Sequence, residues 1–161
     1  MKKEIKLYST IFILALSALM LSGCGAEKNM KKGEKYLAVG EYYDAATQFK
    51  RAYQRTAPKE REKRGKIALK VAFCNERINS TQKALAAYSN AIRYNQASTR
   101  DRLSYARLLL KNGAYKQAET EFRTVLDSMP DNVLAKNGLA SAQNAPQWKK
   151  DGSRYQVKRM D

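Results

Sequence analysis

Small and bulky side chains recur along this chain in a fixed order, and this recurrence limits the possible folds more than any other feature. Each copy begins with a residue suited to a turn and continues with a small residue, an aromatic residue and a second small or β-branched residue at constant offsets. The second and third copies lie 34 residues apart, whereas the first and second lie 39 apart. The three copies are Gly40, Tyr42, Ala45, Phe49, Ala52; Asn79, Thr81, Ala84, Tyr88, Ala91; and Gly113, Tyr115, Ala118, Phe122, Val125.

A further small residue stands seven positions before each leading Gly or Asn. These residues are Gly33, Ala72 and Ala106, and Ala140 continues the series 34 residues later. A small residue on one helix lets a second helix approach closely, and an aromatic side chain of the second helix then fills the remaining space. Each unit is therefore predicted to be an antiparallel pair of helices.

The longer spacing between the first two copies places five extra residues around Pro58 to Arg64. They are expected to form either a lengthened helix end or an exposed connector. Pro58 and Pro130 are predicted to follow the ends of second helices, because proline cannot continue a helix that needs its N–H. Asp131 and Asn132 offer N-cap oxygens for a last helix.

This arrangement resembles the tetratricopeptide repeat (TPR), which has a period of about 34 residues with small and aromatic residues at these spacings. The third copy matches best, with Gly113-Ala114-Tyr115-Lys116-Gln117-Ala118, Phe122 and Pro130. Asn79 replaces the usual glycine, and Asn tolerates the left-handed turn conformation. The resemblance implies an all-α solenoid in residues 24–144, with repeats at about 26–58, 65–98 and 99–132 and a capping helix at 133–144, which would cover apolar surface.

The N-terminus carries a second motif. Lys2, Lys3 and Lys6 precede an apolar run from Ile11 to Leu21, which is shorter than the about 20 residues that span a bilayer. The following Leu21-Ser22-Gly23-Cys24 resembles the lipobox of bacterial lipoproteins. The resemblance implies a signal peptide over 1–23 and acylation of Cys24, as with palmitate. An ordinary signal peptide that ends near a cysteine is the alternative.

The amino-acid composition argues against several kinds of functional site. The chain contains no histidine and two cysteines, so acylation of Cys24 would leave Cys74 without a disulfide partner. Cys74 lies in an apolar helical pattern and is expected to be a buried, inert thiol. These features argue against a metal site, a cofactor or a catalytic nucleophile. Paired acids such as Glu119 and Glu121 are two residues apart and point to different faces of a helix, unlike the facing carboxylates of a glycosidase.

The chain is strongly basic, with a formal net charge of +16. Removal of residues 1–23 takes away three lysines and one glutamate and leaves 28 basic and 14 acidic side chains. Such an excess favours anionic partners. No basic, aromatic-rich RNA-binding motif is present, so nucleic acid is not an expected partner. Many of these cations are expected to be no more than solvated helix surface.

Residues 145–161 are expected to form a linker or an irregular or extended tail, because Ser153 to Lys158 alternate like a strand. The order of segments resembles the N-terminal part of cell-envelope lipoproteins that join TPRs to a β-propeller and an OmpA-like domain. These segments are the lipobox, the repeats, the last helix, Ala145-Pro146-Gln147-Trp148 and Tyr155-Gln156-Val157. That family is associated with type IX secretion and gliding. The resemblance implies a scaffold role for the repeats, while the roles of the absent domains do not carry over.

In a TPR array, first helices line the inner surface, where extended peptides or helices bind. A groove rich in cations suits acidic segments. The alternative is that binding uses the convex side or the tail. The predicted groove residues are Lys66, Lys70, Phe73, Arg77, Arg100, Leu103, Arg107 and Lys111.

Chaperone-binding TPR domains hold a C-terminal carboxylate with Lys, Asn and Arg, but the first pair here presents Met30 and Glu34 at the corresponding sites. That specialisation is therefore not expected. The sequence favours a non-enzymatic interaction scaffold, anchored in the outer membrane on its periplasmic face and binding envelope proteins. An assembly factor for outer-membrane proteins and a peptidoglycan-associated accessory protein or weak hydrolase remain alternatives, with peptidoglycan as a further candidate partner.

Overall fold

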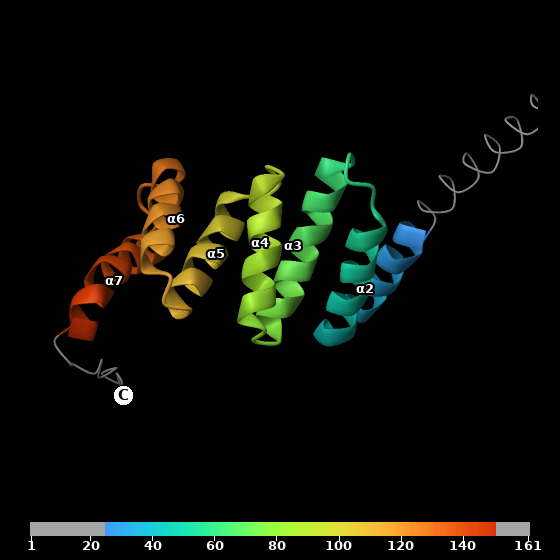
Figure 1. The fold of residues 1–161 in the computed structure, drawn as a ribbon, viewed down its shortest axis with the longest axis horizontal. Helices are drawn as coiled ribbons and strands as arrows, with labels where there is room; N and C mark the ends of the chain where they lie inside the picture. Colours follow the sequence, from blue (N-terminus) through green and yellow to red (C-terminus); the bar gives the residue numbers. More distant parts are fainter. Residues whose placement is uncertain (1–24, 151–161) are drawn as a thin grey trace, which may run out of the picture. The chain divides into compact units, whose positions relative to one another are not determined.

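The chain folds into successive antiparallel helices. The structure, a computed structural model, describes the backbone of residues 25–150 and the side chains of residues 25–145. Residues 25–38 are helical, and α2 (Tyr42–Arg55), α3 (Arg61–Arg77), α4 (Thr81–Arg93), α5 (Thr99–Lys111), α6 (Tyr115–Ser128) and α7 (Val133–Lys150) follow (Figure 1). No strand occurs among residues 25–150. The predicted all-α, TPR-like fold is confirmed for this part, whereas the signal segment 1–23, Cys24 and the strand-like residues 153–158 lie outside it.

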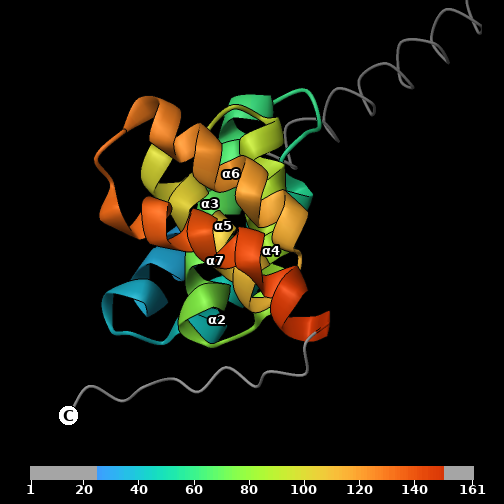
Figure 2. The same cartoon turned by 90° about the vertical axis from the view of Figure 1, so that its left-hand side faces the viewer.

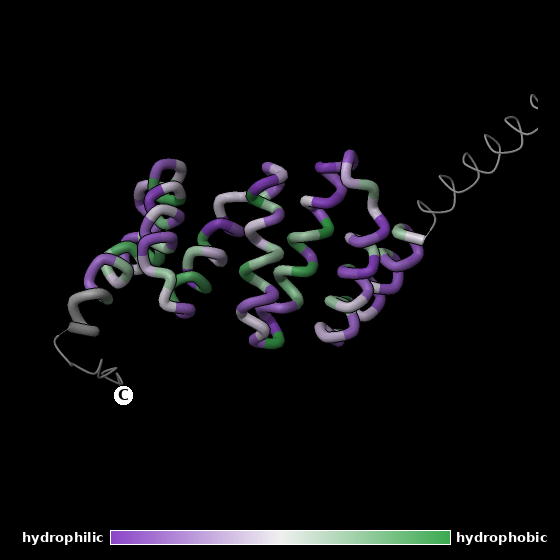
Figure 3. Tube along the Cα trace, viewed as in Figure 1, coloured by the Kyte–Doolittle hydropathy of each residue, from purple (hydrophilic) through white to green (hydrophobic). Residues whose placement is uncertain are grey.

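The helices form two compact units, which divide between Gln96 and Ala97. In the first unit, helix 25–38 packs on α2, α2 on α3, and α3 on α4. In the second, α6 packs on both α5 and α7, and α7 also contacts α5 (Figure 2). Hydrophobic and hydrophilic positions alternate along α3 and α4, as expected for helices with buried and exposed sides (Figure 3).

The recurring small and aromatic residues form the core, as their spacing predicted. Three second-helix residues of each copy are buried, whereas Tyr42, Thr81 and Tyr115 at the starts of these helices are half-buried. The buried residues are Ala45, Phe49, Ala52, Ala84, Tyr88, Ala91, Ala118, Phe122 and Val125. The hydroxyl of buried Tyr88 donates a hydrogen bond of 2.7 Å to Glu76 Oε2. This bond compensates for the polar atom that Phe49 and Phe122 lack.

Turns between paired helices use the left-handed backbone conformation. The φ angles are 77° at Gly40, 55° at Asn79 and 80° at Gly113, so Asn79 behaves as predicted. After Asn79, the Ser80 N–H donates to the Asn75 carbonyl, which closes the end of α3 in the manner of a Schellman motif. Asn95 has the same conformation, with φ 56°, between the second and third repeats.

The five extra residues of the first spacing lie within helices. The connectors 56–60 and 94–98 have equal length. Helix α3 has 17 residues against 13 in α5, and α2 has 14 against 13 in α4. The second repeat therefore begins at Arg61, earlier than the predicted residue 65, and α3 carries an additional turn at its N-terminus.

That additional turn is fixed to the preceding helix by Arg64. Its guanidinium donates to the Thr56 carbonyl at 2.8 Å and lies 4.1 Å from the centroid of the Tyr53 ring. A carbonyl at a helix end needs such a donor because it has no partner within the helix. Arg64 thus joins the end of α2 to the start of α3.

The last helix differs from its prediction in two respects. Asn132 caps α7 as predicted, and its side chain accepts the Ala135 N–H at 2.9 Å. However, α7 runs to Lys150 instead of ending at residue 144. The predicted end at residue 144 was therefore wrong: the helix continues through Pro146, and the four residues after it contain no glycine or second proline that would end it.

Ala140 was also predicted wrongly as a packing position. It is exposed, whereas Ala135, Gly138 and Ala142 are buried. The equivalent Ala72 and Ala106 are buried in helices that are followed by a second helix of the same pair. In residues 133–150, α7 has no such following helix, so the same position faces outward.

Close approach at glycine sets the separation of helices around the aromatic rings. A Cβ atom at Gly33 would lie 2.5 Å from Phe49 Cε1, and one at Gly138 would overlap the Phe122 ring. We therefore expect Gly33→Ala to destabilise the protein by about 1–2 kcal/mol despite the better helix propensity of alanine. Thermal and urea unfolding followed by circular dichroism measure this change.

The Phe49→Leu background provides the control for that substitution. A shorter side chain at position 49 relieves the overlap, so Gly33→Ala should cost less there than in the wild-type background. An equal cost in both backgrounds would show that the ring and the glycine are not coupled.

Cys74 lies in the core, as predicted, with 0% of its surface exposed. Burial raises the pKa of its thiol from 9.0 to about 11. Because the thiolate is the reactive form, we expect alkylation of Cys74 at pH 8 to be at least about 100-fold slower in the folded protein than in denaturant. Iodoacetamide labelling followed by mass spectrometry of the Cys74 peptide tests this; rapid labelling of the native protein would contradict the buried position.

Candidate functional site

The predicted site residues of α3 lie along one side of that helix. Lys66, Lys70, Phe73 and Arg77 are separated by three or four positions, and such residues share a face because a helix has about 3.6 residues per turn. Arg100, Leu103, Arg107 and Lys111 form the equivalent row on α5. The two rows belong to different compact units. A common groove formed by both therefore remains a prediction.

The α3 row ends in a cluster of one guanidinium and two rings, in which Phe73 and Arg77 are exposed and Tyr42 of α2 is half-buried. The ring of Phe73, which is 38% exposed, meets Tyr42 edge to face at 6.1 Å between centroids. The guanidinium carbon of Arg77 lies 5.2 Å from the Phe73 centroid and 5.9 Å from that of Tyr42. Each cation–π contact is worth about 0.5–1 kcal/mol at such a site and orients the Arg77 side chain.

Two lysines of the row have carboxylate partners within the chain. Lys70 Nζ lies 2.7 Å from Glu34 Oε1, and Lys66 pairs with Glu62 one turn away. The bond with Lys66 lowers the pKa of Glu62. Exposed pairs of this kind contribute about 0–1 kcal/mol, so a partner's carboxylate can compete for either lysine.

The Glu34–Lys70 pair joins helix 25–38 to α3 and balances the charge of Lys70 within the chain. The expectation that the chain lacks a chaperone-type carboxylate site stays a prediction.

The cations of the α5 row are more accessible to a partner than the two paired lysines of the α3 row. Arg100, Arg107 and Lys111 are exposed, and no salt bridge found within residues 25–145 involves them. Leu103 is half-buried beside them. By contrast, the neighbouring Arg102 pairs with Glu121 of α6 at 2.8 Å and is only 27% exposed, so that cation has a structural role.

Two features of the site were missed from the sequence. Tyr42 was assigned to the repeat pattern alone, and its ring completes the cluster with Phe73 and Arg77. Glu34 was noted as unsuited to a chaperone-type site, but its pairing with Lys70 was not predicted. Both contacts join residues from neighbouring helices, 31 and 36 positions apart in the chain.

The described residues offer little to other kinds of site. Within residues 25–145, no group of three or more His, Cys, Asp or Glu side chains is placed to hold a metal ion. No described helix is both long enough and apolar enough to cross a membrane.

Comparison with known proteins agrees with the helical geometry. Residues 79–145 match the tetratricopeptide repeat family. Among curated proteins, the chain is 30% identical over 127 residues to DnaJ homolog subfamily C member 3 of Gallus gallus. This alignment covers 75% of the chain but 24% of the relative, so the chain spans about a quarter of the length of that protein.

Solved TPR structures share the fold at low sequence identity. YrrB, a TPR protein with an unusual peptide-binding site, has a TM-score of 0.66 at 18% identity and covers 93% of this chain and 75% of its own. The C-terminal TPR-containing domain of a Plasmodium falciparum FK506-binding protein has a TM-score of 0.64 at 14% identity, with coverage of 81% and 93%. The first TPR of Spaghetti (RPAP3), bound to an HSP90 peptide, has a TM-score of 0.60 at 19% identity, with coverage of 78% and 95%. Residues 79–145 therefore match the tetratricopeptide repeat family, and the described residues have the tetratricopeptide repeat fold.

Proposed function

We propose that this protein is a non-enzymatic, lipid-anchored scaffold that binds proteins of the bacterial cell envelope through its first-helix faces. The observation that carries the proposal is the cluster that exposed Arg77 and Phe73 of α3 form with half-buried Tyr42 of α2. Arginine and aromatic side chains are the residue types that most often dominate protein interfaces. TPR folds generally serve as interaction modules, and neighbours such as the first TPR of Spaghetti hold peptides.

Acidic protein segments are the proposed partners. The chain has a net charge of +16, and Arg100, Arg107 and Lys111 form an exposed basic row on α5. Arginine binds carboxylates with two parallel hydrogen bonds, which adds direction to the attraction. The pairs of Lys66 and Lys70 with Glu62 and Glu34 keep those lysines in place until a partner's carboxylate replaces the internal one.

The envelope location rests on the N-terminal motif. Leu21-Ser22-Gly23 before Cys24 supports acylation, and Gly25 is not the aspartate that retains lipoproteins at the inner membrane in the best-known sorting scheme. We therefore propose attachment to the outer membrane, with the repeats on the periplasmic side. A role in type IX secretion is the finer proposal, and it rests on the resemblance to TPR, β-propeller and OmpA-like lipoproteins.

Acylation of Cys24 has a direct test. Cells grown with an alkyne analogue of palmitate should incorporate the label into the wild-type chain and into Cys74→Ala, because the buried thiol is not the acceptor. Cys24→Ala should lose the label and leave the membrane fraction. Label retained by Cys24→Ala, or absent from the wild type, would contradict the anchor.

The basic row on α5 has a separate test. Arg107→Glu should weaken crosslinking of the protein to its envelope partners in intact cells by about fivefold or more, because it replaces attraction with repulsion at an exposed interface position. The double variant Arg100→Glu with Arg107→Glu should lose more. Quantitative mass spectrometry of the crosslinked partners measures the effect.

Lys116→Glu is the matched control, since it changes the net charge equally at an exposed position of α6 outside the row. It should leave crosslinking within about twofold of the wild type, and circular dichroism should show equal helicity for all variants. Equal loss in Arg107→Glu and Lys116→Glu would indicate a net-charge effect. Unchanged crosslinking in Arg107→Glu would place the binding surface elsewhere.

A further inference from the structure

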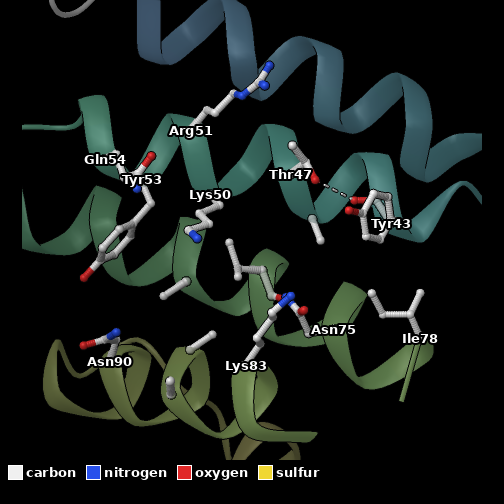
Figure 4. A pocket seen from close by; sticks show the side chains of 15 residues that line it. Tyr43, Thr47, Lys50, Arg51, Tyr53, Gln54, Asn75, Ile78, Lys83 and Asn90 are labelled. Atoms are coloured by element: carbon white, nitrogen blue, oxygen red, sulfur yellow. Dashed lines mark hydrogen bonds between the residues drawn. The ribbon is translucent and has the colours of Figure 1, made fainter. Parts of the chain in front are cut away.

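The first unit contains a hollow on the other side of α3. Helices α2 and α4 border it and α3 forms its floor, with a cavity volume of about 660 Å³ (Figure 4). The floor residues Ala68, Val71 and Asn75 lie roughly 150° around α3 from the row that contains Phe73 and Arg77, at about 100° per residue. The hollow is therefore a different surface from the one assigned above.

Small side chains create the hollow. Ala46 of α2, Ala68 of α3 and Ala87 of α4 line its base, with 8%, 2% and 6% of their surfaces exposed. Alanine lets neighbouring helices approach but leaves the space above it empty. The base is apolar, and Asn75 Nδ2 is engaged by the Val71 carbonyl at 2.8 Å. An occupant thus meets an apolar base.

The rim carries positive charge. Lys50 and Lys83 extend toward the hollow from α2 and α4, whereas Arg51 points away from its centre (Figure 4). None of the fifteen residues that line the hollow is acidic. Both lysines are exposed, and no salt bridge found within residues 25–145 involves them. Two cations above an apolar base attract an amphipathic anion.

The dimensions fit a short helix. Along α2 the lining runs from Tyr43 to Gln54, about 16 Å at 1.5 Å per residue, and along α4 from Lys83 to Asn90, about 10 Å. The length of the α2 lining equals about three turns of a helix laid parallel to α2 and α4. A helix in such a groove contacts it with apolar side chains at i, i+4 and i+7.

We propose that this hollow binds an amphipathic acidic helix of a partner protein. The apolar side chains of the partner helix would cover the alanine base, and the carboxylates of that helix would pair with Lys50 and Lys83. The chain's own ends do not match, because residues 1–24 hold three basic and one acidic side chain, and residues 146–161 hold five basic and two acidic side chains. A second copy carries the same large positive charge. This binding site is separate from the first-helix faces proposed above, and the proposal does not depend on binding at those faces.

A designed peptide pair tests the proposal with the full chain. The probe is a synthetic helix of about 15 residues with leucines on one face and glutamates flanking them, and its control replaces every glutamate by lysine. Fluorescence anisotropy should detect binding of the glutamate peptide and at least about tenfold weaker binding of the lysine peptide. Equal binding of both peptides would overturn the proposal.

Variants locate the binding. Lys50→Glu and Lys83→Glu should each weaken binding of the glutamate peptide about fivefold or more, while Lys116→Glu, which lies outside the hollow and outside the α5 row, should change its affinity less than about twofold. Ala86→Trp provides a second, uncharged variant, because exposed Ala86 lines the hollow and its enlargement fills the space without entering the core. It should also weaken binding about fivefold or more.

The remaining outcomes are decisive as well. Unchanged affinity in Lys83→Glu and Ala86→Trp would overturn the proposal even if the peptide binds elsewhere. Loss of binding in Arg107→Glu but not in Lys50→Glu would assign the peptide to the α5 row. Vesicles of anionic phospholipid that displace the peptide from the wild type and bind Lys83→Glu more weakly would identify a lipid surface as the occupant, which would also overturn the proposal of a protein helix.

Discussion

The packing of an aromatic ring against a glycine on a neighbouring helix is the contact on which the rest of this structure depends. Phe49 and Phe122 are fully buried because Gly33 and Gly138 have no side chain in the space that each ring occupies. The first contact lies within a repeat and the second between a repeat and the last helix. The same packing of a large side chain against a small one therefore joins helices within a repeat and joins a repeat to the last helix. Buried Ala45, Ala84 and Ala118 supply further small side chains on the second helices.

The small side chains of the core also affect the outer surfaces of the helices. Among residues 25–145, most of the buried apolar side chains are alanines, whereas the charged side chains lie at least partly at the surface. Helix α3 illustrates the division: one side presents Phe73 and Arg77, and the opposite side contributes Ala68 and Val71 to the base of a hollow. Helix α3, with 17 residues, thus contributes to two chemically distinct surfaces. One carries large exposed side chains, and the other is a hollow lined by small side chains.

Sequence reasoning predicted those elements whose cause is local or periodic. The paired helices, the left-handed turn at Asn79, the Asn132 cap and the buried thiol of Cys74 all follow from spacing or residue type. The burial of Ala140 was predicted wrongly, because the periodic pattern does not reveal whether a helix has a following partner. The pairing of Lys70 with Glu34 and the hollow between Lys50 and Lys83 were missed, since each joins residues more than 30 positions apart from different helices. The shared groove of the α3 and α5 rows stays a prediction.

The additional turn of α3 shows how such a chain tolerates changes in length. Four residues are close to one full turn of a helix, so their presence at the N-terminus of α3 leaves the orientation of every later residue almost unchanged. Phe73 keeps its side and Ala72 keeps its place in the core. An insertion of two residues would instead rotate one part of the helix by about half a turn relative to the other and move the core positions into water. Viable insertions within the helices of this molecule are thereby restricted to whole turns, and Arg64 indicates how a new turn can acquire a structural role of its own.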